Sequence, residues 1–90
     1  EELIVNTGDL LQIWSNDQFP APVHRVLAND KFDRYSAAFF LNPKYETDVV
    51  PLSKTNQRFR SLNWGDFRSK RSAGDYADLG EEIQIDDFRV

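Results

Sequence analysis

The chain contains no cysteine, which excludes a disulfide framework and any thiolate metal site. Because small secreted domains usually depend on disulfides, we expect an intracellular, cytoplasmic setting. No apolar run approaches the ~18 residues of a membrane-spanning helix. The opening residues 1–5 also lack the basic region of a signal peptide. The sequence therefore predicts neither a membrane span nor a secretory leader.

An excess of positive charge is also absent. The chain has 11 Lys and Arg against 15 Asp and Glu, which gives a formal charge of −4 at pH 7 and a pI near 4.8. Phosphate binding relies on clustered cations, so this balance argues against a nucleic-acid partner. Apolar residues make up 40% and aromatic residues 13%, which is too much for a disordered chain. We therefore expect one small folded domain, or a piece of a larger protein, with a thin core.

The first half of the chain reads as short strands separated by turns. Residues 3–6 form an apolar run closed by a Thr-Gly-Asp turn, whereas residues 10–14 are too few to distinguish a strand from a helical turn. Residues 23–28 and 34–41 both favour strands, and the five residues between them predict a β-hairpin. The Asn-Pro pair at residues 42–43 then ends the second strand. Since the chain opens on a strand, we expect further chain upstream.

The second half has fewer clear signals. Residues 48–52 are suited to a sheet edge. Asn63 can cap a helix with Asp66 at its third position, and Gly74 is expected to end that helix after about two turns. The acidic residues 81–89 predict a terminal strand or a docking segment. We expect the tail acids to lie at the surface, and likewise the basic side chains of Arg58, Arg60, Arg68, Lys70 and Arg71.

The hairpin carries the residues that could perform chemistry. Side chains alternate between the faces of a strand, so Arg34, Ser36 and Phe40 share one face. Antiparallel pairing across residues 29–33 would direct His24 toward the same interior. Imidazole is a suitable iron ligand, and Arg presents a planar fork to a carboxylate that a Ser hydroxyl can also contact. A dicarboxylate could therefore bridge a metal at His24 and the guanidinium of Arg34.

These residues resemble the C-terminal half of the isopenicillin N synthase-like family of iron and 2-oxoglutarate dioxygenases. The resemblance covers residues 3–43 and rests on residues 8–16 (GDLLQIWSN), 23–26 (VHRV), 34–36 (RYS) and 39–43 (FFLNP). It implies a double-stranded β-helix, or jelly roll, with Fe(II) and 2-oxoglutarate as cofactors. By this resemblance His24 is the distal iron-ligating His, Arg34 and Ser36 bind the 2-oxoglutarate carboxylate, and Phe40 lines the substrate pocket.

The chain departs from the family pattern in one respect. His24 is the only histidine, so the His-x-Asp motif of the family is absent. Two of the three protein ligands of a facial triad would then lie upstream, in an N-terminal part of the same enzyme. We therefore expect this polypeptide alone to be inactive as an oxygenase.

The fold class that we predict is mainly β, a partial double-stranded β-helix (jelly roll) with a short C-terminal helix. Residues 1–43 would form the C-terminal part of the β-helix core. Residues 44–90 would form an extension whose helix packs outside the barrel. The parent reaction implied by the resemblance is the oxidation of a small organic substrate by O2, coupled to decarboxylation of 2-oxoglutarate to succinate.

Several alternatives remain open. An iron oxidase of the same family that does without 2-oxoglutarate would use Arg34 and Ser36 for another carboxylate. A non-catalytic β-rich interaction module would keep the hairpin without the chemistry. Arg34 could instead form an ion pair with Asp30 or Asp33. For the remaining aromatic residues of the hairpin we expect core or sheet packing: Phe32, Tyr35 and Phe39.

Overall fold

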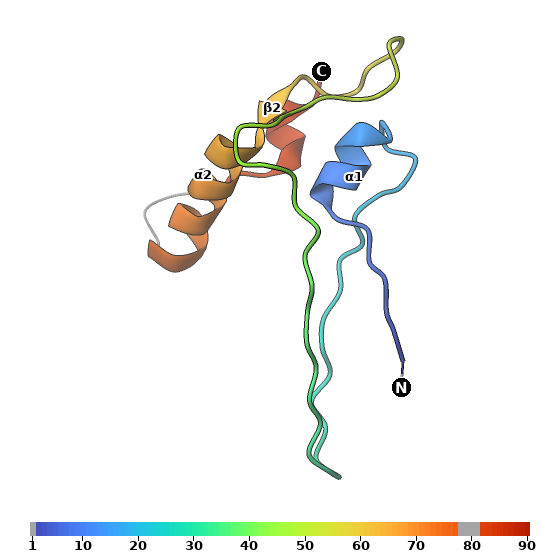
Figure 1. Ribbon diagram of the computed structural model, residues 1–90, viewed down its shortest axis with the longest axis vertical. Coiled ribbons are helices and arrows are strands. Elements are labelled where there is room, and N and C mark those ends of the chain that lie inside the picture. Colours follow the sequence, from blue (N-terminus) through green and yellow to red (C-terminus); the bar gives the residue numbers. More distant parts are fainter. Residues whose placement is uncertain (1, 78–81) are drawn as a thin grey trace.

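Six buried hydrophobic side chains, contributed by helices, strands and one connecting segment, form the core. The computed structural model describes residues 2–77 and 82–90. Its elements are α1 (Asp9–Trp14), β1 (Asp48–Val49), β2 (Leu62–Asn63), α2 (Trp64–Ala77) and the 3-10 helix η1 (Ile85–Phe88) (Figure 1). The core residues are Ile13, Val49, Phe59, Leu62, Phe67 and Ile85. We call residues 9–21, 44–77 and 82–90 the packed unit.

Helix α1 shows that the ambiguous stretch at its position is helical. The helix ends in a Schellman pattern: the N–H of Asp17 donates to the carbonyl of Gln12 at 2.9 Å, and the N–H of Asn16 donates to that of Ile13 at 3.0 Å. Asn16 has a φ of 56°, in the left-handed region that Asn tolerates better than most residues. The sharp reversal directs residues 18–21 back toward the helix.

The two short strands and the start of α2 agree with the sequence signals. Strands β1 and β2 pair antiparallel, with Val49 opposite Leu62, so the first two residues of the predicted sheet edge are indeed a strand. Asn63 caps α2, because its Oδ1 accepts the backbone N–H of Asp66 at 3.2 Å. The prediction that Asn63 is the N-cap and Asp66 the third residue of this helix is confirmed.

Helix α2 continues through Gly74 to Ala77, so the predicted end at Gly74 is wrong. A Gly inside a helix costs roughly 1 kcal/mol relative to Ala. Here the missing side chain permits a close approach, because a Cβ on Gly74 would lie 3.0 Å from the Cα of Glu82. This glycine serves packing between segments instead of helix termination.

The described part of the tail docks on the packed unit. Residues 85–88 form η1, the side chain of Ile85 is buried, and Arg89 forms an isolated antiparallel bridge with Phe59. This agrees with the docking alternative for the tail and not with a regular strand. Residue 81, at which the predicted segment begins, lies outside the described residues.

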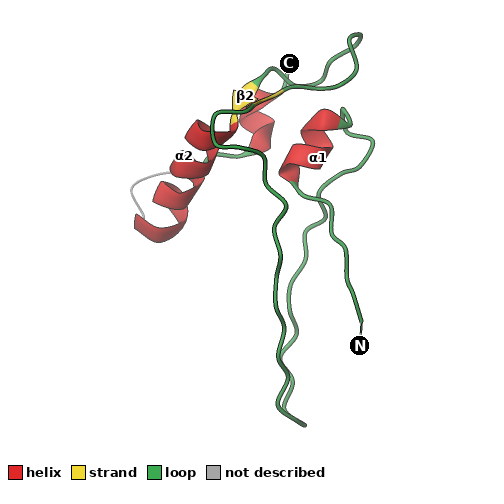
Figure 2. Ribbon diagram, viewed as in Figure 1, coloured by secondary structure: helices red, strands yellow, loops and turns green. Residues whose placement is uncertain are grey.

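Residues 22–43 form a long excursion that we call the arm. Figure 1 shows it running away from the packed unit and back again as two extended limbs, and Figure 2 shows no strand in it. Among the described residues, which include the whole arm, no backbone hydrogen bond joins the two limbs. The arm raises the radius of gyration to 15.7 Å. A compact chain of this length would have about 12 Å.

The chain of the predicted hairpin therefore runs out and back as expected, but the backbone hydrogen bonds that would pair its two strands are not formed. The strands expected at residues 3–6, 23–28 and 34–41 are not formed, and the mainly β class is not confirmed, because the strands of the described residues are only two residues long. The physical reason is that an isolated two-stranded hairpin is marginal in water and needs a surface against which to pack. No described helix is both long and apolar enough to cross a membrane.

Candidate functional site

All four predicted site residues lie on the arm, and all four are exposed. His24 belongs to the first limb, whereas Arg34, Ser36 and Phe40 belong to the second. The fraction of the Phe40 surface that is exposed is 77%. Their convergence on one interior therefore stays a prediction, since the arm encloses no interior by itself.

The imidazole of His24 has one defined contact. Its Nδ1 lies 2.9 Å from the carbonyl oxygen of Pro22. A carbonyl oxygen only accepts hydrogen bonds, so Nδ1 carries the hydrogen in this arrangement. In this tautomer of the neutral ring, the Nε2 lone pair is available to a metal ion. A hydrogen bond to a backbone carbonyl selects the ligating nitrogen in the same way in many metal-binding histidines.

Arg34 spans the two limbs near the turn. Its Nη2 donates to the carbonyl of Leu27 at 3.4 Å, a long hydrogen bond. The ion pairs of the described residues do not include Arg34, so the alternative of a structural pair with Asp30 or Asp33 is not observed. The guanidinium remains exposed and able to meet a carboxylate.

The aromatic residues of the arm are not core residues in this chain, contrary to the expectation from the sequence. The exposed fractions are 69% for Phe32, 92% for Tyr35 and 87% for Phe39. Their types predicted burial, but burial requires an opposing apolar surface. The core forms from the packed unit alone.

The donors present do not form a complete metal centre. Among the residues that the structure describes, no group of three His, Cys, Asp or Glu side chains could hold a metal ion. The single imidazole of His24 fits the role of one ligand, with its Nε2 directed away from the carbonyl contact. A facial triad needs two further protein ligands. The described residues therefore supply a candidate ligand for such a centre but not the complete set.

The base of the arm is anchored by side chains on α1 and just before it that the sequence analysis did not single out. Gln12 donates from Nε2 to Asp17 Oδ1 at 2.9 Å and accepts the backbone N–H of Ala21 on Oε1 at 2.8 Å. Thr7 donates from Oγ1 to the carbonyl of Pro20 at 2.7 Å. One signal could have drawn attention to Gln12: it is the polar residue within the apolar run of residues 10–14.

Asp17 is the main electrostatic centre of the packed unit. Its carboxylate accepts hydrogen bonds from Arg89 at 2.7 and 3.2 Å and from Arg58 at 3.4 Å. The hydrogen bonds from Arg89, with further donors from Gln12 and Arg58, lower the pKa of Asp17 from 3.8 to about 2. The same pair raises the pKa of Arg89 above its ordinary value. The end of α1 is thus tied to the end of the chain.

One of the predicted surface arginines, Arg71, instead forms ion pairs that join α2 to two other segments. Arg71 on α2 is only 18% exposed and donates to Asp9 at 2.6 Å and to Glu82 at 2.7 Å. Its guanidinium also lies 5.1 Å from the ring centre of Phe67. The expectation of a solvated side chain is wrong for Arg71, because its partners lie far away in the sequence.

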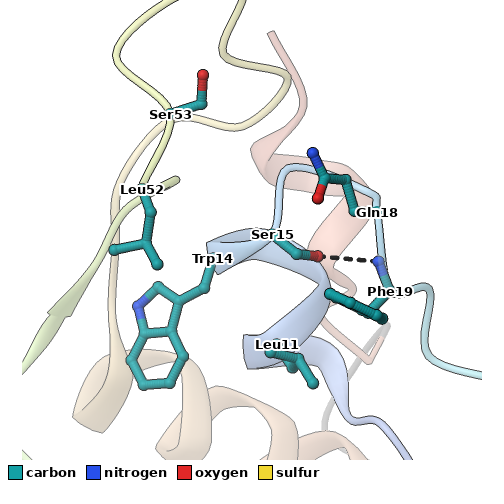
Figure 3. A pocket seen from close by; sticks show the side chains of 7 residues that line it. All are labelled: Leu11, Trp14, Ser15, Gln18, Phe19, Leu52 and Ser53. Atoms are coloured by element: carbon teal, nitrogen blue, oxygen red, sulfur yellow. Dashed lines mark hydrogen bonds between the residues drawn. The ribbon is translucent and has the colours of Figure 1, made fainter.

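The surface also has an apolar hollow beside α1, with a volume of about 320 Å³. Figure 3 shows Trp14 and Leu11 along the helix, Leu52 facing them, and the hydrogen bond from the Phe19 N–H to Ser15 Oγ, which measures 3.0 Å. Gln18 and Ser53 complete the lining. None of the four predicted site residues belongs to this hollow, so the sequence and the cavity point to different places.

A comparison with protein families matches the segment that contains α1 and the arm. The sequence model of the 2OG-Fe(II) oxygenase superfamily matches residues 1–43, which include His24, Arg34 and Ser36. The chain has no significant match among solved structures.

Several plant enzymes are similar to the chain. Gibberellin 2-beta-dioxygenase 5 of Oryza sativa subsp. japonica is 43% identical over 98% of this chain and 27% of its own length. Gibberellin 2-beta-dioxygenase 6 of the same organism is 36% identical over 98% of the chain and 24% of its own length. A bi-functional coumaroyl CoA and feruloyl CoA ortho-hydroxylase of Ipomoea batatas is 50% identical over 56% of the chain and 14% of its own length. The chain thus spans about a quarter of the length of the two rice relatives.

Proposed function

Because the sequence model of the 2OG-Fe(II) oxygenase superfamily matches residues 1–43, we propose that this chain is the C-terminal part of an Fe(II)- and 2-oxoglutarate-dependent dioxygenase. The observation that carries the proposal is the match over residues 1–43, the segment that contains His24, Arg34 and Ser36. The whole enzyme would oxidise a small organic substrate with O2 and convert 2-oxoglutarate to succinate and CO2.

Each site residue has a role in this proposal. His24 supplies one iron ligand through Nε2, and its contact with Pro22 supports that tautomer. Arg34 and Ser36 bind the distal carboxylate of 2-oxoglutarate, for which a guanidinium fork and a hydroxyl are suited. Phe40 forms part of the substrate pocket wall. Bound iron would supply the activation of O2 for the oxidation.

The chain by itself is inactive in this proposal. One imidazole cannot hold Fe(II) against water, and the described residues contain no second and third ligand close to it. The remaining ligands would come from the part of the enzyme outside this chain. Anaerobic titration of the 90-residue chain with Fe(II) by calorimetry should show no submicromolar binding, and such binding would refute the proposed inactivity.

The cosubstrate is tested in the full-length enzyme under anaerobic conditions. Addition of 2-oxoglutarate to the Fe(II) enzyme should produce a visible charge-transfer band, because only a cosubstrate that chelates iron gives one. The Arg34→Ala variant should need at least about tenfold more 2-oxoglutarate, since it loses a charged bidentate contact. Arg68→Ala, at an exposed arginine of α2, is the control.

The outcomes separate the rival functions. Iron binding without the band would favour the family member that does without 2-oxoglutarate. Failure of the full-length enzyme to bind iron would favour the non-catalytic interaction module. If Arg34→Ala required the same concentration of 2-oxoglutarate as the unmodified enzyme, the proposed role of Arg34 in binding the carboxylate would be wrong.

For the substrate we propose a gibberellin. The two rice relatives named as gibberellin dioxygenases align along 98% of the chain, whereas the CoA ester hydroxylase aligns along 56%. The longer alignment includes residues of the packed unit beyond the arm. Turnover of a panel of gibberellins against feruloyl CoA by the full-length enzyme tests this choice, and a preference for the CoA ester would reverse it.

A further inference from the structure

Gln12 holds both ends of its side-chain amide in hydrogen bonds at the base of the arm. We propose that Gln12 is a positioning residue for His24, because it fixes the turn from which the His24-bearing limb departs. The proposal deepens the proposed function and rests on the role of His24 as an iron ligand. Gln12 lies on α1 and acts on His24 only through the backbone.

The orientation of the Gln12 amide is unambiguous. The N–H of Ala21 can only donate, so the atom 2.8 Å from it is Oε1. Nε2 then donates to the carboxylate of Asp17 at 2.9 Å, and a carboxylate with a pKa of about 2 is an acceptor at neutral pH. Both ends are satisfied and the residue is half-buried, so rotation of the amide would break two hydrogen bonds.

The acidic end of this link is itself fixed. Asp17 is held by the bidentate contact with Arg89, whose guanidinium lies 4.6 Å from the ring centre of the buried Phe59. A connected path therefore runs from the core through Arg89 and Asp17 to Gln12 and Ala21. The backbone at residue 21 is tied to the rigid part of the molecule and not only to its neighbours in sequence.

The other end of the path reaches the imidazole. Pro22 follows Ala21 directly, and its carbonyl oxygen lies 2.9 Å from Nδ1 of His24. Thr7 holds the carbonyl of Pro20, and Ser15 accepts the N–H of Phe19, so the two residues before the Gln12 contact are held as well. The start of the first limb thus has a set direction although the limb itself is exposed. An iron ligand needs such a direction, because metal affinity depends on ligands that are oriented before binding.

The first experiment uses the 90-residue chain and measures amide hydrogen exchange by NMR. The Gln12→Met variant keeps the length and half-buried volume of the side chain but removes both hydrogen bonds. Exchange of the Ala21 amide should accelerate about tenfold, as expected for the loss of one hydrogen bond, while the amides of Leu62 and Phe67 keep their protection. Gln18→Met, the same change at an exposed position nearby, should leave Ala21 unaffected.

A double variant provides the rescue. Gln12→Glu alone brings a second carboxylate against Asp17 and should release Ala21. In the combination of Gln12→Glu with Asp17→Asn, the asparagine amide can donate to the new carboxylate, whose other oxygen accepts from Ala21. Ala21 protection should therefore return, although the lost contact with Arg89 lowers global stability. Unchanged Ala21 exchange in Gln12→Met, or equal acceleration at all amides, would overturn the proposal.

The second experiment tests whether the Gln12 side chain affects the Fe(II) affinity of the full-length enzyme. In the full-length enzyme, Gln12→Met should weaken Fe(II) affinity on the order of tenfold, the size seen when support for a ligand is lost. Its unfolding midpoint should stay close to that of Gln18→Met. Iron affinity within twofold of the unmodified enzyme would overturn the proposal. If the unmodified enzyme binds no iron, the proposed function fails, whereas the Ala21 measurement still decides whether Gln12 fixes the base of the arm.

Discussion

The packed unit and the arm contain the same kinds of residue in opposite states. Val49 is fully buried in the packed unit, whereas Val23 in the arm is fully exposed. Phe59 is fully buried, whereas Phe39 is 87% exposed. Apolar residues alone therefore do not make a core in this molecule. Burial follows from the opposing surfaces that α1, α2 and η1 provide to one another, and the arm has no such surface among the described residues.

The largest expected effect comes from removing the same side chain in the two regions. Phe59→Ala deletes a fully buried ring and should lower the free energy of unfolding by about 3–5 kcal/mol. Phe39→Ala in the arm should change it by less than about 0.5 kcal/mol. Urea unfolding followed by circular dichroism measures both, and equal losses would break the comparison.

The next effect concerns a close contact inside the packed unit. A Cβ on Gly65 would lie 2.7 Å from the carbonyl oxygen of Tyr45, so Gly65→Ala should cost roughly 1–3 kcal/mol through overpacking. Gly8→Ala is the matched control, because a Cβ there meets nothing within 4 Å. Thermal unfolding of the two variants should separate them clearly, and similar midpoints would contradict the tight contact.

A smaller effect depends on pH. The pKa of Asp17 is lowered in the folded chain from 3.8 to about 2, so its stabilising contribution is present above pH ~4 and is lost as the pH falls toward 2. Allowing for solvent screening, we expect about 1 kcal/mol. Urea unfolding from neutral to acidic pH should show a shallower loss for Asp17→Asn than for the unmodified chain. Asp30→Asn, in the arm, should leave the profile unchanged.

The last test needs no change in stability at all. Trypsin recognition sites occur in both regions, with Arg25, Lys31 and Arg34 in the arm and Arg60 and Arg71 in the packed unit. Brief digestion should cut the arm first, because exposed backbone without hydrogen bonds opens at almost no free-energy cost. Intact mass identifies the first cuts, and early cleavage after Arg71 would contradict the ion pairs at that residue.

Local signals in the sequence predicted local structure well. Asn63 and Asp66 form a cap because the interaction spans three residues and needs no other part of the chain. The turn of the arm also follows from nearby residues, since Asn29 accepts the N–H of Lys31 and donates to the carbonyl of Phe32. Such contacts can be read from neighbouring residues alone.

Features that depend on distant partners could not be predicted. Gly74 was expected to end a helix because glycine commonly follows the last helical residue. Its close approach to Glu82, which accounts for a glycine inside α2, has no local signature. The ion pair of Arg71 with Asp9 joins residues 62 positions apart, and no pattern announces it. The convergence of the candidate site residues on one interior stays a prediction, because these residues lie on the exposed limbs of the arm. Their proposed roles need two further protein ligands for the metal, and no such group occurs among the described residues.

The exposed arm also has a consequence for the behaviour of the chain in solution. Its two limbs offer unpaired backbone groups and apolar side chains to any neighbouring molecule, which is the arrangement that favours association between sheet edges. At neutral pH the net charge of −4 opposes such encounters, but this repulsion vanishes near the pI of 4.8. Light scattering during a slow acid titration should therefore rise to its maximum close to the isoelectric point.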